Sequence, residues 1–268
     1  MWHRFYIYNE SLKEAAEFQS HTGIEIYEVV RVTKGVPLFI EDHLKRFFHS
    51  GRLCHVEIPL NGETIIRLLN LLISSNGITE GNIRFSWGFQ PEGSFQAYFI
   101  PHHYPTREEI REGVICGILE AERKDPNAKV VQSGLRLTAD QMIRQQGCYE
   151  ILLLNSMGEF TEGSRSNLFF VKKNIFITSP AEEVLPGITR NKVIDLIRSG
   201  GRKLEERSLP LDELESVEAA FITGTSPKIL PVRMIGDLRL KTDVPEVRKL
   251  MTEYDGLIWR YLRERGGK

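Results

Sequence analysis

The chain has 268 residues, and its 35 Lys and Arg against 36 Asp and Glu give a formal net charge of −1. With basic residues scattered along the chain, this balance excludes the concentrated positive charge typical of proteins that bind nucleic acids or membrane surfaces. A hydrophobic fraction of 41% at this length supplies enough apolar area for one compact unit or for two smaller lobes.

The N-terminal segment and the cysteines predict a cytoplasmic protein without a metal site. Residues 1–5 lack the shape of a signal peptide, and no apolar run approaches the length of a membrane span. Cys54, Cys116 and Cys148 lie far apart in largely apolar stretches and lack metal-ligand spacing. An odd number of such cysteines favours free thiols in a reducing compartment over disulfides or a metal site.

The first hundred residues predict a small α/β lobe. We expect strands at residues 5–8, 24–32, 82–89 and 95–100, and helices at 41–53 and 61–74. The second helix has one thick apolar face, made of Ile65, Ile66, Leu68, Leu69, Leu72 and Ile73. Residues 101–106 are rich in turn formers, so we place a domain boundary there, with a small domain at 1–104 and a linker at 105–112.

The rest of the chain, residues 113–268, predicts a larger domain that mixes strands with helices. Strands are expected at 113–119, 150–154, 203–207, 219–222 and 229–234, and a hairpin joins 168–171 to 175–178. Helices are expected at 136–146, 191–198 and 244–265.

The most informative motif is Gly158-Glu159-Phe160-Thr161-Glu162-Gly163-Ser164-Arg165-Ser166-Asn167, which an apolar strand follows. A turn with an acid, a glycine and a Ser/Asn cluster predicts that the carboxylate of Glu162 is fixed at the edge of a strand by its neighbours.

Two further motifs predict a cradle for an anion. Leu185-Pro186-Gly187-Ile188-Thr189-Arg190 opens into a helix, and Thr223-Gly224-Thr225-Ser226-Pro227 follows an apolar run. The first amides of a helix and the hydroxyls of such turns are donors that suit a phosphate. A carboxylate beside a phosphate cradle is what pyridoxal phosphate requires, because its pyridinium proton needs an anion and its phosphate needs donors.

In this order and spacing, the motifs resemble the fold-type IV, or class IV, pyridoxal-phosphate enzymes. That family includes branched-chain aminotransferases, D-amino acid aminotransferases and 4-amino-4-deoxychorismate lyases. Segments 26–32, 37–47 and 147–153 extend the resemblance, which covers residues 23–232. It implies an α/β (α+β) fold with a small N-terminal α/β lobe and a larger, β-barrel-like C-terminal lobe that carries helices and binds the cofactor. It also implies a homodimer.

The resemblance assigns the amine that condenses with the cofactor aldehyde to Lys129, eighteen residues before Gly147. Its apolar neighbours Ala128 and Val130 would disfavour the ammonium form. Lys124 is the nearby alternative, but it lies in a charged run that is typical of a solvated turn.

The other cofactor roles follow from the same resemblance. Glu162 matches the acid that pairs with the pyridine nitrogen, and Arg46 matches the basic residue that grips the phosphate. The remaining matches are Ile188, Thr189 and Thr225 as phosphate donors, and Leu185 as the residue that packs on one face of the ring.

The substrate carboxylate has two possible binding sites. One branch of the family holds it with the turn containing Ser226 and with a tyrosine, here Tyr27. The D-amino acid branch uses an arginine whose expected position here is Phe89, so that clamp is absent. We expect Arg31, Arg165 or both to replace it, because a guanidinium offers two parallel donors to a carboxylate.

We therefore predict a pyridoxal-phosphate aminotransferase that acts by a ping-pong mechanism on a small or medium α-amino acid and a 2-oxo acid. Its substrate would be of the D-amino acid or branched-chain type. Arg84 resembles an arginine of the branched-chain enzymes, whereas the segments around Tyr27 and Gly147 are similar to the D-amino acid branch. The alternatives are aminodeoxychorismate lyase chemistry on the same scaffold and a non-catalytic homologue that binds pyridoxal phosphate.

Overall fold

The computed structural model describes residues 3–21, 23–89, 93–123, 126–130 and 133–266. Its contacts divide the chain into two compact units. The first contains Met1–His103, Ala128–Val131 and Leu257–Lys268, and the second contains Tyr104–Asn127 and Gln132–Gly256. The short segment that carries Lys129 therefore groups with the first unit, whereas we had expected it in the second domain.

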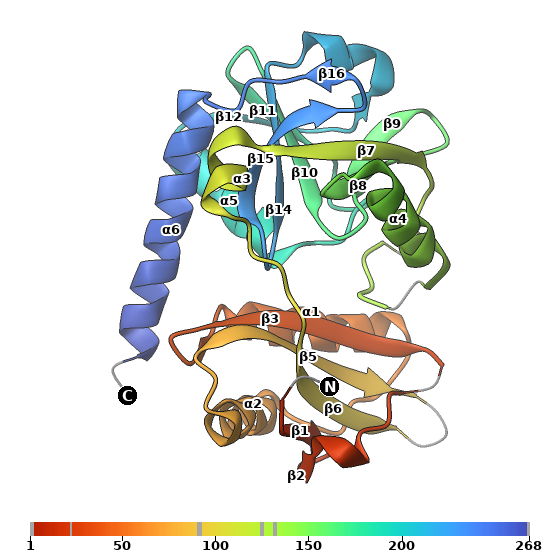
Figure 1. The fold of residues 1–268 in the computed structure, drawn as a ribbon, viewed down its shortest axis with the longest axis vertical. Coiled ribbons are helices and arrows are strands. Elements are labelled where there is room, and N and C mark those ends of the chain that lie inside the picture. The colour runs from red at the N-terminus through yellow and green to blue at the C-terminus, as the bar shows by residue number, and fades with distance from the viewer. Residues whose placement is uncertain (1–2, 22, 90–92, 124–125, 131–132, 267–268) are drawn as a thin grey trace. The chain divides into compact units, whose positions relative to one another are not determined.

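The first unit is built on a six-stranded sheet with the order β2-β1-β6-β5-β3-β4 (Figure 1). Its strands are β1 (Phe5–Tyr8), β2 (Ser11–Glu14), β3 (Glu25–Thr33), β4 (Val36–Pro37), β5 (Glu80–Gly88) and β6 (Ser94–Ile100). Its helices are the 3-10 turn η1 (Ala15–Glu17), α1 (Ile40–Leu53) and α2 (Gly62–Asn76).

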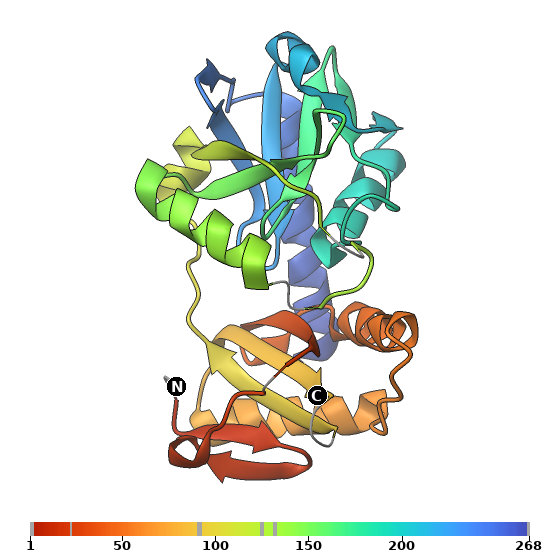
Figure 2. The ribbon, with the colours of Figure 1, turned by 90° about the vertical axis from the view of Figure 1, so that its right-hand side faces the viewer.

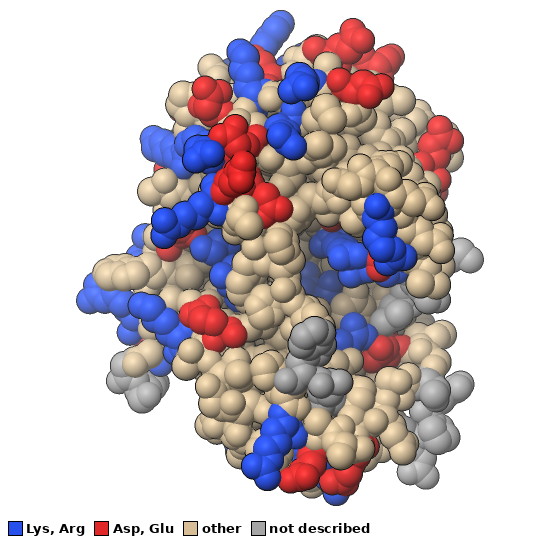
Figure 3. Space-filling view, viewed as in Figure 1, with Lys and Arg blue, Asp and Glu red and all other residues tan. Residues whose placement is uncertain are grey.

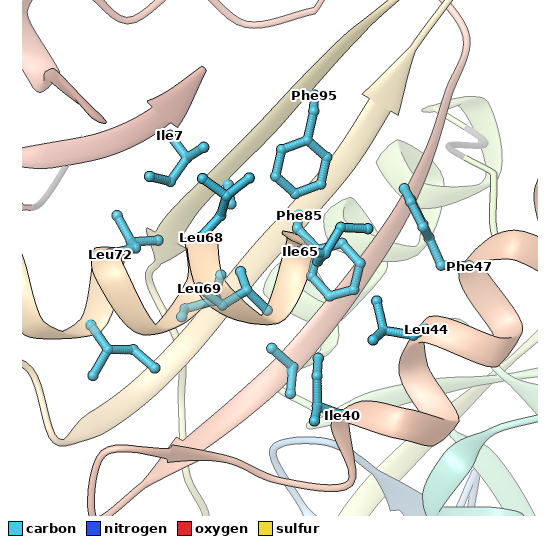
Figure 4. Close-up of a cluster of buried hydrophobic side chains, with 14 of the residues drawn as sticks. Ile7, Ile40, Leu44, Phe47, Ile65, Leu68, Leu69, Leu72, Phe85 and Phe95 are labelled. Carbon is cyan, nitrogen blue, oxygen red and sulfur yellow. The ribbon is translucent and has the colours of Figure 1, made fainter. Parts of the chain in front are cut away.

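One face of this sheet carries the core of the unit. Along β3 buried residues alternate with half-buried ones, as expected for a strand with one face against a core. The buried face packs against α1 and α2, where Phe47 and Phe85 meet edge to face and Leu68 and Leu72 are fully buried (Figure 4). The opposite face carries several polar side chains, among them Arg31 and Arg84.

The second unit contains a ten-stranded sheet that closes into a barrel. Strands β10, β14, β15, β7, β8 and β9 pair in succession, and a further pairing of β9 with β10 closes the ring. The barrel strands are β7 (Val114–Glu120), β8 (Glu150–Leu154), β9 (Glu159–Gly163), β10 (Asn167–Lys172), β14 (Ala219–Gly224) and β15 (Lys228–Ile235). The remaining strands are β11 (Ile175–Thr178), β12 (Lys203–Glu206), β13 (Leu209–Pro210) and β16 (Leu238–Arg239).

The helices of this unit are α3 (Arg107–Glu112), α4 (Ser133–Gln146), α5 (Ile188–Ser199) and the 3-10 helix η2 (Leu211–Ser216). Figure 2 shows α5, in teal, beside the strands of the barrel, where it packs on β14 and β12. The last helix, α6 (Pro245–Arg265), begins in the second unit and ends in residues of the first. Helix α3 lies in the segment expected to be a linker, where Thr106 and Glu109 form a capping box at its start.

The expected α/β fold with a barrel-like second part is confirmed. Side chains of both charges are interspersed on the face seen in Figure 3, in keeping with the balanced composition. Within the described residues, no helix is both long and apolar enough to cross a membrane.

Candidate active site

In the first unit, Lys129 is held by its backbone against β3 and α1. The amide of Tyr27 donates to the Lys129 carbonyl at 3.1 Å, and the amide of Lys129 donates to Ser50 Oγ at 3.1 Å. Val130 forms a bridge with Ile26 that continues this pairing. The Lys129 Nζ lies 4.8 Å from the centre of the Tyr27 ring. These contacts hold the backbone of Lys129 in place, and so fix the point from which its side chain extends.

Arg46, the predicted phosphate ligand, forms a buried ion pair with Glu28. Its Nε donates to Glu28 Oε1 at 2.7 Å and its Nη2 to Oε2 at 2.6 Å. His43 Nδ1 lies 2.7 Å from the same Oε2, and a carboxylate partner requires that this nitrogen carries the hydrogen. Burial raises the pKa of Glu28, but Arg46 and His43 outweigh it and lower the pKa to about 2. Burial lowers the pKa of His43.

The polar face of the first sheet gathers several further groups around Tyr27. Arg84 on β5 lies with its guanidinium carbon 4.1 Å from the centre of the Tyr27 ring and pairs with Glu25 on β3. His21 lies 3.2 Å from Glu25. Strand alternation puts Arg31 on this face too, as its spacing from Tyr27 predicted.

In the second unit, the carboxylate of Glu162 is buried and held by donors from three segments. Arg123 Nε donates to Oε1 at 2.8 Å. The amide of Leu185 donates to Oε2 at 3.2 Å, and Asn167 Nδ2 lies 3.4 Å from the same oxygen. Asn167 also donates to the Leu185 carbonyl at 2.8 Å. Asn167 belongs to the motif around Glu162, whereas Arg123 and Leu185 are distant in sequence, so neighbours along the chain supply only part of these contacts.

The turn after Glu162 is organised by a second buried acid, Glu150 on β8. Its carboxylate accepts hydrogen bonds from the hydroxyls of Ser164 at 2.7 Å and Ser166 at 2.8 Å, and from the amide of Arg165 at 3.2 Å. This explains the serines of the motif, because they supply the donors that a buried carboxylate needs.

The start of α5 lies beside Asn167. The helix begins at Ile188, one turn earlier than expected, with Gly187 as its N-cap. A Cβ at Gly187 would clash with Asn167 Oδ1, so only glycine allows this close approach. Tyr254 on α6 donates to Thr189 Oγ1 at 3.3 Å, which leaves the hydroxyl proton of Thr189 to be donated to an acceptor. The first amides of α5 also lack acceptors within the helix.

Thr223 is the neighbour of Asn167 across the sheet. The two residues lie directly opposite each other on β14 and β10, so their side chains share one face. Thr223 is fully buried, and among the described residues its Oγ1 has no hydrogen-bond partner. The strand ends at Gly224, and Thr225 and Ser226 form the hairpin that leads to β15.

The structure thus groups the predicted residues by unit. Lys129, Arg46, Tyr27 and Arg31 lie in the first. In the second, contacts through Asn167 connect the set Glu162, Leu185, the start of α5 and the end of β14.

The guanidinium of Arg165 is not part of this connected set. It is half-exposed and pairs with Asp140 on α4. Lys124, the alternative amine, lies outside the described residues.

Several residues of these networks were not predicted as site residues, among them Glu28, Arg123, Glu150, Asn167 and Tyr254. Arg123 lies in the charged run that was interpreted as a solvated turn. Glu150 could have been found as the single acid of an otherwise apolar strand, and Glu28 as an acid whose place in the strand alternation puts it between Ile26 and Val30 on the core face.

The chain is similar to known aminotransferases. The chain is 27% identical over 246 residues to a putative branched-chain-amino-acid aminotransferase of Methanocaldococcus jannaschii, covering 86% of this chain and 85% of the other. It is 25% identical over 241 residues to D-alanine aminotransferase of Bacillus licheniformis, covering 83% of each. A crystal structure of the branched-chain aminotransferase from the thermophilic archaeon Thermoproteus uzoniensis with norvaline superposes with a TM-score of 0.85. That match has 23% identity and covers 97% of this chain and 98% of the other.

The model of the family described as amino-transferase class IV matches residues 25–235, which is most of the chain. That family is dependent on pyridoxal phosphate. The acid, the lysine and the glycine-led helix start that the sequence singled out all lie within the matched residues, and the protein belongs to the class IV aminotransferases.

Proposed function

We propose that this protein transfers an amino group between an α-amino acid and a 2-oxo acid with pyridoxal phosphate as cofactor. The observation that carries the proposal is the buried carboxylate of Glu162, held by three donors next to a helix start that has no capping side chain. A buried acid fixed in this way suits a cationic ring nitrogen, and the helix start suits a phosphate.

The residues present fit the cofactor. Thr223 Oγ1 is a buried hydroxyl that has no hydrogen-bond partner among the described residues, and it lies on the same sheet face as Asn167. Gly187 allows Asn167 to approach the start of α5, and Tyr254 donates to Thr189 Oγ1, which leaves the hydroxyl proton of Thr189 for an acceptor. These groups are donors, as a phosphate requires.

When bound, pyridoxal phosphate supplies an aldehyde that accepts an amine and a ring that withdraws electrons from the substrate Cα. Lys129 would bind the aldehyde carbon through its amine. Once substrate has released it, the amine would carry a proton between the substrate Cα and the cofactor C4′. Glu162 would hold the proton on the ring nitrogen, and Leu185 would pack against one face of the ring.

The amides and hydroxyls of Ile188, Thr189 and Thr225 would bind the phosphate, and Arg46 would be a further donor. The ion pair with Glu28 fixes the guanidinium plane of Arg46 and is neutral overall, so Arg46 would act chiefly as an oriented donor. His43 would stabilise this pair without contacting the cofactor.

Substrate would be held by the polar face around Tyr27 and by the hairpin at Ser226. Arg31 and Arg165 are the proposed ligands of its carboxylate, and Arg84 is the further candidate because it stacks on Tyr27. A homodimer in the cytoplasm is part of the same proposal, and light scattering of the purified protein tests the dimer.

The proposal is tested with single L- and D-amino acids added to protein that has been incubated with pyridoxal phosphate. An aminotransferase changes the absorbance of the bound cofactor with a matching amino acid, releases one keto acid per site, and recovers the first spectrum with 2-oxoglutarate or pyruvate. Pyruvate released from aminodeoxychorismate without an acceptor would instead reveal a lyase. Cofactor that borohydride traps on the protein without any turnover would reveal a carrier.

A further inference from the structure

We propose that Arg123 is a positioning residue that holds the Glu162 carboxylate in one orientation, as an anion, for the nitrogen of the cofactor ring. The inference rests on the proposed function and extends it to a residue that the sequence assigned to a solvated turn. Arg123 follows the end of β7, and its side chain is mostly buried beside Glu162.

The guanidinium of Arg123 makes two hydrogen bonds, one to the acid and one to the backbone. Arg123 Nε donates to Glu162 Oε1 at 2.8 Å, and Nη2 donates to the carbonyl of Ser164 at 3.2 Å. One planar group therefore fixes both the acid and the backbone two residues beyond it. Leu185 and Asn167 approach the other oxygen, Oε2, so the carboxylate is held at both oxygens and cannot rotate without losing a contact.

The positive charge of Arg123 stabilises the ionised form of the buried Glu162 carboxylate. A buried carboxylate is stable only with a cation or with several donors, because burial removes its hydration. Arg190 also interacts electrostatically with Glu162. Its guanidinium, however, donates to the Ser179 carbonyl at 2.7 Å and pairs with Glu206 at 3.3 Å. Arg123 is in direct contact with Glu162, and guanidinium stays charged at every accessible pH.

Arg123 acts through Glu162, so its effect depends on that carboxylate. The test is a double-mutant cycle of Arg123→Met with Glu162→Gln. Arg202→Met serves as the matched control, because Arg202 is also largely buried and forks onto the carboxylate of Glu253. Arg123→Lys keeps the positive charge but removes the planar group that donates to both Glu162 and the Ser164 carbonyl.

Three quantities are measured for each variant: the dissociation constant of pyridoxal phosphate, the pH dependence of the absorbance of the bound cofactor without substrate, and the rate and KM of the amino-acid half-reaction. Arg123→Met should lower the rate about tenfold with KM changed less than about threefold, and should shift the spectral pH profile. Arg123→Lys should recover part of the rate. In the Glu162→Gln background the same change should have almost no further effect.

The inference is overturned if Arg123→Met matches the parent in rate and spectral profile, or if it lowers the rate equally with and without the Glu162 carboxylate. Should Arg123→Met fail to fold by circular dichroism, the cycle is completed with Arg123→Lys, and equal effects in both backgrounds overturn the inference in the same way. Failure of the proposed function looks different, because then the parent and Arg202→Met would neither bind pyridoxal phosphate nor turn over an amino acid.

Discussion

Arg46 and Glu28 form a buried ion pair, with two hydrogen bonds of 2.7 and 2.6 Å between guanidinium and carboxylate. Glu28 lies on the core face of β3, where its neighbours along the strand are Ile26 and Val30. An ionised acid in such a place is stable only while it is paired. This ion pair thus connects Arg46, the proposed phosphate ligand, to a strand of the buried core of the first unit.

The ionisation of Glu28 should make folding sensitive to acid. Its pKa is lowered from 4.5 to about 2, so its contribution to the free energy of unfolding is complete above pH 4.5 and is lost as the pH falls toward 2. The contribution is about 3 kcal/mol. Urea unfolding from about pH 6 down to about pH 2.5 should show this loss in the parent and a flatter profile in Glu28→Gln. Glu14→Gln is the control, since that acid forms an exposed pair with Arg4. An equal effect of both variants would contradict the prediction.

Arg46→Ala should weaken both folding and cofactor binding. Removing one partner of a buried ion pair costs roughly 3–5 kcal/mol of stability, because Glu28 is left without its guanidinium. Loss of a charge-assisted phosphate contact should raise the dissociation constant of pyridoxal phosphate about tenfold or more. The exposed pair of Arg4 with Glu14 supplies a control, Arg4→Ala, that should change neither quantity. Unchanged cofactor affinity in folded Arg46→Ala would limit Arg46 to a structural role.

Lys129→Ala should abolish transamination and leave the fold intact, because the backbone contacts of residue 129 do not need its side chain. Borohydride reduction followed by peptide mapping should find the cofactor on Lys129 in the parent and on no residue in the variant. Lys228→Ala, which removes a half-exposed lysine paired with Asp255, should behave like the parent. Cofactor trapped on another lysine in an active variant would refute the assignment.

Gly187→Ala should weaken cofactor binding more than it weakens folding. The added methyl group would push against Asn167, which contacts both Glu162 and Leu185. We expect at least a roughly tenfold rise in the dissociation constant of pyridoxal phosphate, equivalent to about 1.4 kcal/mol. Gly134→Ala is the matched control, since its Cβ meets open space on α4. Equal affinities for the two variants would show that Asn167 can move at no cost.

Arg31→Ala should raise KM for the amino acid about tenfold, with a smaller effect on cofactor affinity, because a two-donor contact to the substrate carboxylate is lost. Arg165→Ala tests the second proposed ligand, whose guanidinium pairs with Asp140. Arg84→Met tests the further candidate, whose guanidinium stacks on Tyr27. If none of the three variants changes KM, the carboxylate must bind at the Thr225–Ser226 hairpin.

Local patterns in the sequence predicted most of the regular elements. The strand at 5–8 has the predicted bounds, and helix α1 begins one residue before the predicted 41. The 3.6-residue and two-residue periods are properties of neighbouring residues, so they can be read from the chain itself. The same is true of Gly187, whose place before a helix is a local signal, although α5 begins one turn earlier than its apolar pattern indicated.

The tertiary structure alone decided which distant residues meet. Closure of the barrel depends on β9 pairing with β10, and β9 has only five residues within a stretch that had been interpreted as a turn. The pairing of Arg123 with Glu162 spans 39 positions, and that of Glu28 with Arg46 joins a strand to a helix. No periodicity records such contacts, because the energy of an ion pair depends on burial and distance in space. The sequence therefore determined the chemical groups available to the site, and the fold determined which of them hold the acid in place.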